Sequence, residues 1–231
     1  MKKLGLIGGI GPEASVTYYR EITSGVQKQL AAPVYPPLTI ESIDVFKVLD
    51  YCAKNDFESL MEYVLEGIQN LKNAGCEACA LTGVTVHHDI EKIQLLSPIP
   101  VISMLDAARD FALMKGYRKI LLLGTEATMK GNFFQRSFAD ADIDTVIPNS
   151  EDIQYIGNII SNELEYGIVR EESASHIISI IRNLKDTKKI DAAVLGCTEL
   201  PMILNDKNTG MPTLNMMEIH ITSLIDYIVH D

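Results

Sequence analysis

The pattern that most constrains this fold is an alternation of short apolar segments with amphipathic segments, which occurs twice along the chain. A short apolar run bounded by glycine or proline is typical of a strand buried on both faces. Strands separated by helices form parallel sheets, because a parallel pair needs a crossover connection. We expect strands at residues 4–7, 38–43, 77–81 and 101–103, then at 119–123, at 145–147 and in the apolar run before Cys197.

Helical spacing of apolar residues predicts the segments between these strands. Pro12 suits the first turn of a helix, because its missing N–H would have no partner there. Asp56 is a suitable N-cap. Residues 44–51 remain ambiguous. The expected helices cover residues 12–30, 56–71, 106–115, 153–166, 173–184 and 217–229.

The two halves of the chain resemble each other at their strand ends. Ile7-Gly8-Gly9 matches Leu123-Gly124-Thr125, and residues 80–85 match residues 194–199. Gly83 and Cys197 therefore occupy equivalent strand ends. We predict an α/β fold of two pseudo-symmetric lobes, each a parallel sheet flanked by helices, with an active-site cleft between them. The first lobe comprises residues 1–102 with 213–231, and the second comprises residues 103–212.

The charge of the chain argues against several classes of partner. A net charge of −11 at pH 7 disfavours binding to nucleic acids and to anionic membrane surfaces. No apolar stretch approaches membrane-spanning length. Gly8, Gly9 and Gly11 interrupt the short apolar run near the N-terminus, which is therefore unlike a signal peptide. We expect a cytoplasmic protein that binds neither nucleic acid nor membrane.

The residues best suited to catalysis follow the apolar run 191–195, as Gly196-Cys197-Thr198-Glu199. Ligands of open α/β sheets bind outside the carboxyl ends of the strands. A thiol that begins a helix there would have a lowered pKa and could act as a base or nucleophile. The alternative is that Cys197 is an inert, buried cysteine.

Other local patterns say less about function. The glycines at positions 8, 9 and 11 lack the spacing of a dinucleotide fingerprint. Cys76 and Cys79 form a C-x-x-C pair without partners at zinc spacing, so we interpret them as structural thiols. His87 and His88 are a poor metal pair, because neighbouring residues on a helix point apart. We expect no metal.

Four segments in order resemble the aspartate/glutamate racemase family: Gly8-Gly9-Ile10-Gly11-Pro12, the strand within residues 100–104, residues 124–129, and Gly196-Cys197-Thr198-Glu199. The resemblance implies a homodimer that uses neither pyridoxal phosphate nor metal. It also implies two cysteines, one per lobe, on opposite faces of the substrate Cα. One thiolate would remove the α-proton, while the other thiol would return a proton from the far side.

The same resemblance implies a set of site residues. Cys197 matches the second family cysteine, and Thr198 matches a residue that holds the substrate carboxylate. Thr125 and Thr128 match hydroxyl donors, although they could instead cap helices. Glu199 could orient Cys197 or act only as a cap. The remaining substrate-binding positions are Gly9, Ile10, Val84 and Thr85.

The chain departs from the family at the first cysteine, where Gly83 stands. Thr85 and His87 keep the register, and we expect His87 to position other groups and His88 to be solvated. Glycine cannot transfer a proton. The nearest candidate is Thr82, whose unactivated hydroxyl is a poor base. A glycine here resembles the arylmalonate decarboxylases of the same superfamily, in which a lone cysteine protonates one face.

A second departure concerns the substrate side chain. Racemases for acidic amino acids clamp that carboxylate with basic residues, and here Lys47 is available or is simply a surface lysine. Glu165 stands where a base would be and would repel a dicarboxylate.

We therefore predict a cofactor-independent racemase or isomerase that acts on aspartate, glutamate or a related small acid, with proton transfer at the α-carbon through Cys197. A malonate-type decarboxylase or a dicarboxylate isomerase is the alternative within the superfamily. A catalytically inactive protein that binds a small acid is the alternative from another class.

Overall fold

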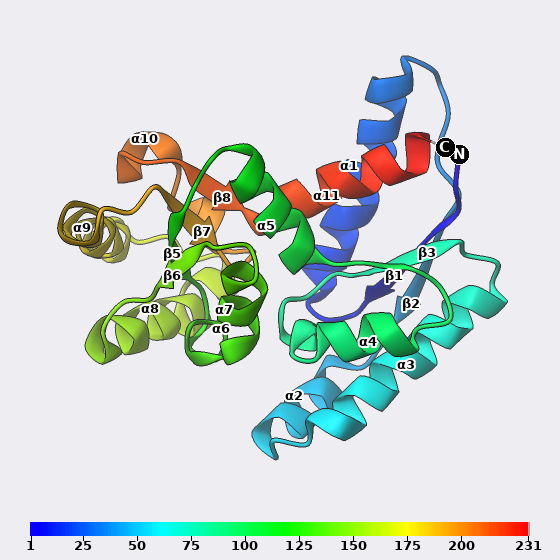
Figure 1. Ribbon diagram of the computed structural model, residues 1–231, viewed down its shortest axis with the longest axis horizontal. Helices are drawn as coiled ribbons and strands as arrows, with labels where there is room; N and C mark the ends of the chain where they lie inside the picture. Colours follow the sequence, from blue (N-terminus) through cyan, green and yellow to red (C-terminus); the bar gives the residue numbers. More distant parts are fainter. Residues whose placement is uncertain (231) are drawn as a thin grey trace. The chain divides into compact units, whose positions relative to one another are not determined.

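The computed structural model describes residues 1–230 and divides the chain into two compact units. The first unit comprises Met1–Ala107 together with the chain from Met217 onward, and the second comprises Ala108–Met216. Each unit contains one four-stranded sheet in which all neighbouring strands are parallel (Figure 1). The predicted α/β class, with two parallel sheets flanked by helices, is confirmed.

The strand orders are β2-β1-β3-β4 in the first unit and β6-β5-β7-β8 in the second. The central strands of each sheet are almost wholly buried, as expected where helices cover both faces. The first sheet consists of β1 (Leu4–Gly8), β2 (Leu38–Ser42), β3 (Ala78–Leu81) and β4 (Val101–Ile102). The second consists of β5 (Lys119–Leu123), β6 (Asp144–Val146), β7 (Ala192–Leu195) and β8 (Thr213–Asn215).

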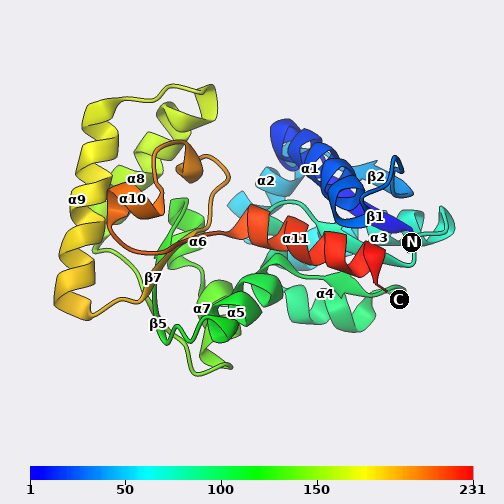
Figure 2. The same cartoon turned by 90° about the horizontal axis from the view of Figure 1, so that it is seen from above.

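Helices cover both faces of the first sheet. Helix α3 packs on one face through an apolar stripe that includes Val64 and Ile68, and α1 and α11 lie on the other face (Figures 1 and 2). The helices of this unit are α1 (Pro12–Leu30), α2 (Val45–Ala53), α3 (Phe57–Asn73), the 3₁₀ turn η1 (Thr85–His87), α4 (Ile90–Leu96), the start of α5 (Met104–Met114) and α11 (Met216–Val229).

In the second unit α7 packs beside β6, and α8 contacts both α6 and α9. The helices are α6 (Glu126–Lys130), α7 (Asn132–Ala139), α8 (Ser150–Asn162), α9 (Glu171–Lys188) and α10 (Asp206–Thr209), with 3₁₀ turns η2 (Leu164–Tyr166) and η3 (Leu200–Met202). The predicted helix 153–166 is thus an α-helix followed by a 3₁₀ turn.

The sheet register reproduces the internal repeat. Ile7 pairs with Leu81 in the first sheet, and Leu123 pairs with Leu195 in the second. The next residue in each unit makes the same hydrogen bond: the N–H of Thr82 donates to the Ile7 carbonyl, and that of Gly196 donates to the Leu123 carbonyl. Gly83 and Cys197 follow directly, so they occupy equivalent positions at the carboxyl ends of β3 and β7.

The boundary between the two lobes differs from the sequence expectation, and the segment that the sequence left ambiguous has a defined structure. Strand β8 pairs with β7, so residues 213–215 belong to the second sheet and not to the first lobe. The ambiguous segment 44–51 lies mostly in α2, which Asp44 caps by accepting a hydrogen bond from the N–H of Phe46. Val48 is the only buried residue of this helix.

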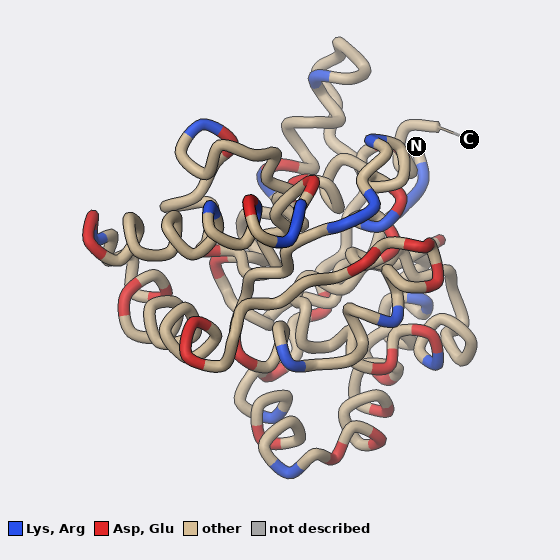
Figure 3. Tube along the Cα trace, turned by 60° about the vertical axis from the view of Figure 1, so that its left-hand side comes forward, with Lys and Arg blue, Asp and Glu red and all other residues tan. Residues whose placement is uncertain are grey.

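Acidic positions outnumber basic ones and are spread along both units (Figure 3). The negative charge is therefore a property of the whole chain and not of one segment. Among residues 1–230, no helix has the length and apolar character needed to cross a bilayer.

Candidate active site

Cys197 lies at the carboxyl end of β7 in direct contact with a carboxylate. Its thiol donates a hydrogen bond to Glu199 Oε2 at 2.8 Å, and the hydroxyl of Thr198 donates to Glu199 Oε1 at 2.7 Å. All three side chains are half-buried. Glu199 makes no capping hydrogen bond at the η3 turn that follows, so its contact is with the thiol and the hydroxyl.

The expectation of a lowered cysteine pKa is wrong. Burial raises the pKa of Cys197, and the negative charge of Glu199 raises it further; a backbone N–H of Glu199 acts in the opposite direction, and Glu165 adds a smaller upward effect. The segment after Cys197 forms a 3₁₀ turn instead of an α-helix, so no helix N-terminus offsets the adjacent carboxylate. The thiol is therefore protonated at neutral pH.

A second carboxylate contributes to the electrostatics of this strand end. Burial raises the pKa of Glu165, and the charge of Glu199 raises it further. Glu165 belongs to η2, which follows α8. The surroundings of Cys197 within the second unit are thus acidic, as the sequence suggested for Glu165.

The loop after β5 lies beside the loop that carries Cys197. Thr125 caps α6 by accepting the N–H of Thr128 at 3.3 Å, and their two hydroxyl oxygens are 3.0 Å apart. A Cβ at Gly196 would lie 3.2 Å from the methyl group of Thr128. The glycine thus permits close approach of the two loops. Capping by Thr125 is observed, and the predicted contact of both threonines with a carboxylate is compatible with it.

In the first unit the end of β3 is fixed by hydrogen bonds. The hydroxyl of Thr82 is fully buried and donates to the Ile7 carbonyl at 3.0 Å, which does not favour a role in proton transfer. Nδ1 of His87 lies 2.8 Å from the Gly83 carbonyl, and the N–H of Met104 donates to His87 Nε2 at 3.2 Å. Nε2 is therefore the acceptor and Nδ1 carries the proton. Burial lowers the pKa of His87 to about 4.

A buried histidine that the sequence analysis missed lies in the same unit. The hydroxyl of Tyr18 donates to His220 Nδ1 at 2.8 Å, and His220 Nε2 donates to the Ile102 carbonyl at 2.9 Å. Burial lowers the pKa of His220 to about 3 and raises that of Tyr18. A lone histidine in an apolar helix such as α11 is the signal that could have indicated it.

The loop after β1 brings Gly9 and Ile10 to the carboxyl edge of the first sheet. Gly9 has a φ of 82°, and a Cβ at this glycine would lie 2.2 Å from the Ile43 carbonyl, so only glycine fits. Ile10 lies against Gly83. Val84 and Thr85 are half-buried at the start of η1. These four predicted binding positions share one edge of one sheet.

Lys47 is exposed on α2, where its ammonium lies 4.1 Å from the ring centre of Tyr63 and 6.0 Å from that of Tyr51. Such contacts stabilise a lysine cation against aromatic faces. The predicted contact of Lys47 with a substrate carboxylate remains a prediction.

Cys76 and Cys79 are free and buried, and burial raises the pKa of Cys79 to about 12. Both properties fit structural thiols.

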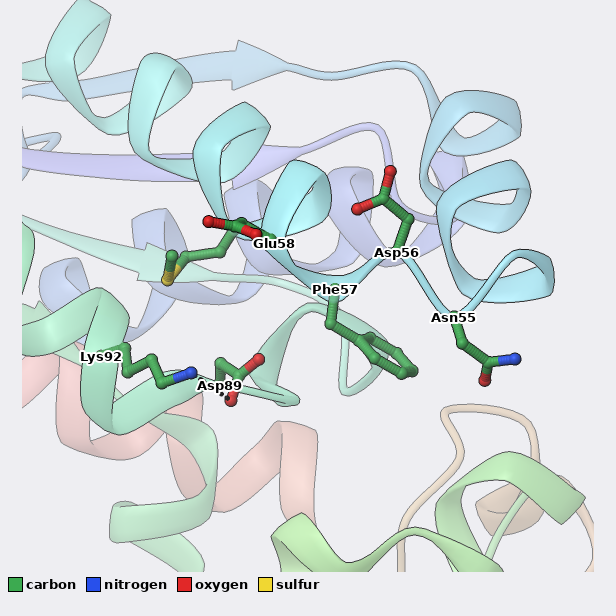
Figure 4. A pocket seen from close by; sticks show the side chains of 7 residues that line it. Asn55, Asp56, Phe57, Glu58, Asp89 and Lys92 are labelled. Atoms are coloured by element: carbon green, nitrogen blue, oxygen red, sulfur yellow. Dashed lines mark ion pairs between the residues drawn. The ribbon is translucent and has the colours of Figure 1, made fainter.

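His88 contacts Phe57 and Asp89, two residues that line a polar pocket of the first unit (Figure 4). His88 is half-buried and not fully solvated, since its ring stacks on Phe57 at 3.6 Å and Nδ1 lies 3.3 Å from Asp89. Asp89 also faces Lys92 at 3.7 Å. No group of three potential metal ligands exists among residues 1–230. The lining residues are Asn55, Asp56, Phe57, Glu58, Met61, Asp89 and Lys92.

Comparisons with known proteins identify the family of this chain. A glutamate racemase of Hydrogenobaculum is 24% identical over 74% of this chain and 64% of its own length. A Yersinia pestis structure assigned to the Asp/Glu racemases has a TM-score of 0.94 at 28% identity, and covers all of both chains. A Pyrococcus horikoshii aspartate racemase homologue has a TM-score of 0.89 at 29% identity, with 99% of each chain covered. The model of the Asp/Glu/Hydantoin racemase family matches residues 7–224. The chain therefore belongs to the Asp/Glu/hydantoin racemase family.

Proposed function

We propose that this chain is a cofactor-independent enzyme that transfers a proton at a carbon α to a carboxylate, with Cys197 as the group that transfers it. The observation that carries the proposal is the 2.8 Å hydrogen bond from the Cys197 thiol to Glu199 at the carboxyl end of β7. A thiol at a ligand-binding strand end, with a carboxylate ready to take its proton, is an acid–base device.

Each direction of transfer follows from this contact. As an acid, the protonated thiol of Cys197 delivers its hydrogen to the planar carbanion and becomes a thiolate. As a base, Cys197 first passes its proton to the carboxylate of Glu199, and the thiolate then removes the α-proton. The raised pKa of Cys197 favours the protonated thiol at neutral pH, so the acid direction needs no prior step. The hydroxyls of Thr125, Thr128 and Thr198 would hold the substrate carboxylate.

The proposed substrates are aspartate, glutamate or a related small acid, and the reaction in the first instance is racemisation. This choice rests on family membership. The charges modify it, because Glu165 and Glu199 place negative charge near the thiol, which disfavours a second carboxylate there. Lys47, which belongs to the first unit, would supply the positive charge for the second carboxylate of such a substrate.

One observation favours a second candidate, the decarboxylation of a malonate-type acid. Gly83 has no side chain to move a proton, and the Thr82 hydroxyl donates its hydrogen bond to the Ile7 carbonyl. In a decarboxylation the carboxyl group leaves as CO2, its bonding electrons remain on Cα, and a single acid supplies the proton. Cys197 alone would suffice. A binding protein without activity would bind the acid and perform neither reaction.

The test is α-proton exchange in deuterated water, followed by NMR across the amino acids and then across substituted malonates. We expect exchange or CO2 release that falls by at least about 100-fold in Cys197→Ser, the scale of a lost general acid–base group. Cys52→Ser, in α2, is the matched control and should retain activity. Activity unchanged by Cys197→Ser would overturn the proposal. Ligand-induced thermal stabilisation without turnover would instead indicate the binding protein.

A further inference from the structure

The space beside Gly83 is already filled. A Cβ built at Gly83 would lie 2.7 Å from Cγ2 of Ile10 and 3.2 Å from its Cβ. The first distance is shorter than real carbon contacts allow. Gly83 does not have a positive φ, so its backbone would accept other residues. What requires glycine at position 83 is therefore the side chain of Ile10.

The loop that carries Ile10 is held in place on both sides. Gly9 and Gly11 have positive φ values of 82° and 85°. The N–H of Gly9 donates to Ser15 Oγ at 2.9 Å, and the N–H of Ser15 donates to the Gly11 carbonyl at 3.3 Å. A β-branched side chain has little freedom at χ1, so the Ile10 methyl cannot move away at low cost.

Gly83 is held equally firmly. Its carbonyl accepts the Nδ1–H of His87 at 2.8 Å, and the residue before it bonds to the end of β1. Neither partner of the Ile10–Gly83 contact can therefore yield easily.

The second unit has different residues at the positions equivalent to Ile10 and Gly83. Extension of the match between Gly8-Gly9 and Gly124-Thr125 aligns Ile10 with Glu126. Glu126 is exposed and pairs with Lys130 at 2.5 Å. Cys197, the equivalent of Gly83, keeps its side chain. The two units thus differ at both members of the pair.

We propose that Ile10 is a specificity-determining residue, which occupies with an apolar side chain the space that a proton-transferring group at position 83 would need. This inference rests on the proposed proton transfer through Cys197, and of the two candidate reactions it favours the one that needs a single proton donor over racemisation. Its consequence is that protons move only through Cys197, so one face of the substrate Cα is used. The substrates are then acids whose reaction needs one proton donor, and exchange or decarboxylation gives a product of one configuration.

The packing is tested by introducing a methyl group at position 83 beside three different residues at position 10. Gly83→Ala should lower the Tm by about 2–10 °C in the wild-type background. The loss should be similar with Ile10→Val, which keeps the γ-methyl group, and much smaller with Ile10→Ala, which removes it. Equal losses in all three backgrounds would overturn the inference. Circular dichroism melting requires no substrate.

The chemistry is tested by following handedness together with exchange. Wild type should exchange or protonate its substrate without inversion. The double variant Ile10→Ala/Gly83→Cys should invert at least about tenfold faster than Gly83→Cys alone, because only the double variant has room for a second thiol. Inversion by wild type at the rate of exchange would contradict the inference. Absence of turnover in wild type would defeat the proposed function, while the melting series would still decide the packing.

Discussion

At the residue scale, the chemistry of this chain depends on which group faces the Cys197 thiol. Glu199 accepts the thiol hydrogen at 2.8 Å, and its charge is the largest contribution after burial to the raised pKa of Cys197. The apolar run ending in Gly196-Cys197 made the position of the thiol predictable, because strand ends can be located from sequence. Its protonation could not be predicted, since it depends on burial and on the orientation of a side chain two residues away.

Replacement of Glu199 by Gln should therefore lower the pKa of Cys197. An amide removes the negative charge that opposes the thiolate, so the thiolate fraction at a given pH rises. Ultraviolet thiolate absorbance during a pH titration measures this directly. Glu165→Gln is the matched control, and should lower the pKa of Cys197 less, because the charge of Glu165 makes the smallest contribution to that raised pKa. An unchanged thiol titration in Glu199→Gln would contradict this assignment.

At the element scale, two buried histidines connect segments that the sequence analysis treated separately. His87 joins the end of β3 to the start of α5. His220 joins α11 to α1 through Tyr18 and to β4 through Ile102. Hydrophobic periodicity predicted most of these elements, since each presents a clear apolar stripe or run. It could not predict the bonds between them, because a buried imidazole leaves no periodic signal.

These histidines should make the stability of the protein depend on pH. Both pKa values are lowered in the folded chain, to about 4 for His87 and about 3 for His220, mainly by burial. An unfolded histidine titrates near about 6.5. Below that pH the unfolded chain binds more protons than the folded one, so the free energy of unfolding decreases as pH falls.

The free energy of unfolding should therefore be least affected by these histidines above about pH 6.5. It should decrease by roughly 2–4 kcal/mol between about pH 7 and pH 5. Urea unfolding at the two pH values measures the loss. NMR titration of the imidazole resonances provides the check, since His87 and His220 should stay neutral at about pH 5. Protonation of either ring near pH 6.5 in the folded protein would contradict the expectation.

At the scale of the whole molecule, a repeated βα pattern gives two sheets with the same strand order. The sequence match at the strand ends predicted this equivalence, because the Gly-containing ends of β1 and β5 are distinctive. The boundary between the two units was harder to predict. Strand β8 has only three residues, Thr213–Asn215, and its pairing with β7 depends on a partner that lies earlier in the chain.

The structure therefore predicts which fragments fold. The second unit, Ala108–Met216, is continuous in sequence and includes all of its sheet. It should give a cooperative melt when expressed alone, as expected for a unit with its own core. A fragment cut at residues 103–212 lacks β8 and should melt at a lower temperature or fail to fold, because the edge of β7 is left unpaired.

The first unit should behave in the opposite way. Residues 1–107 alone lack α11, which leaves the buried hydroxyl of Tyr18 and the Ile102 carbonyl without His220, a cost typical of unsatisfied buried polar groups. Joining residues 217–230 through a short flexible linker should restore a cooperative transition in circular dichroism. If residues 1–107 fold without that segment, α11 is not an integral part of the first unit, and the division of the chain at residues 107 and 217 is wrong.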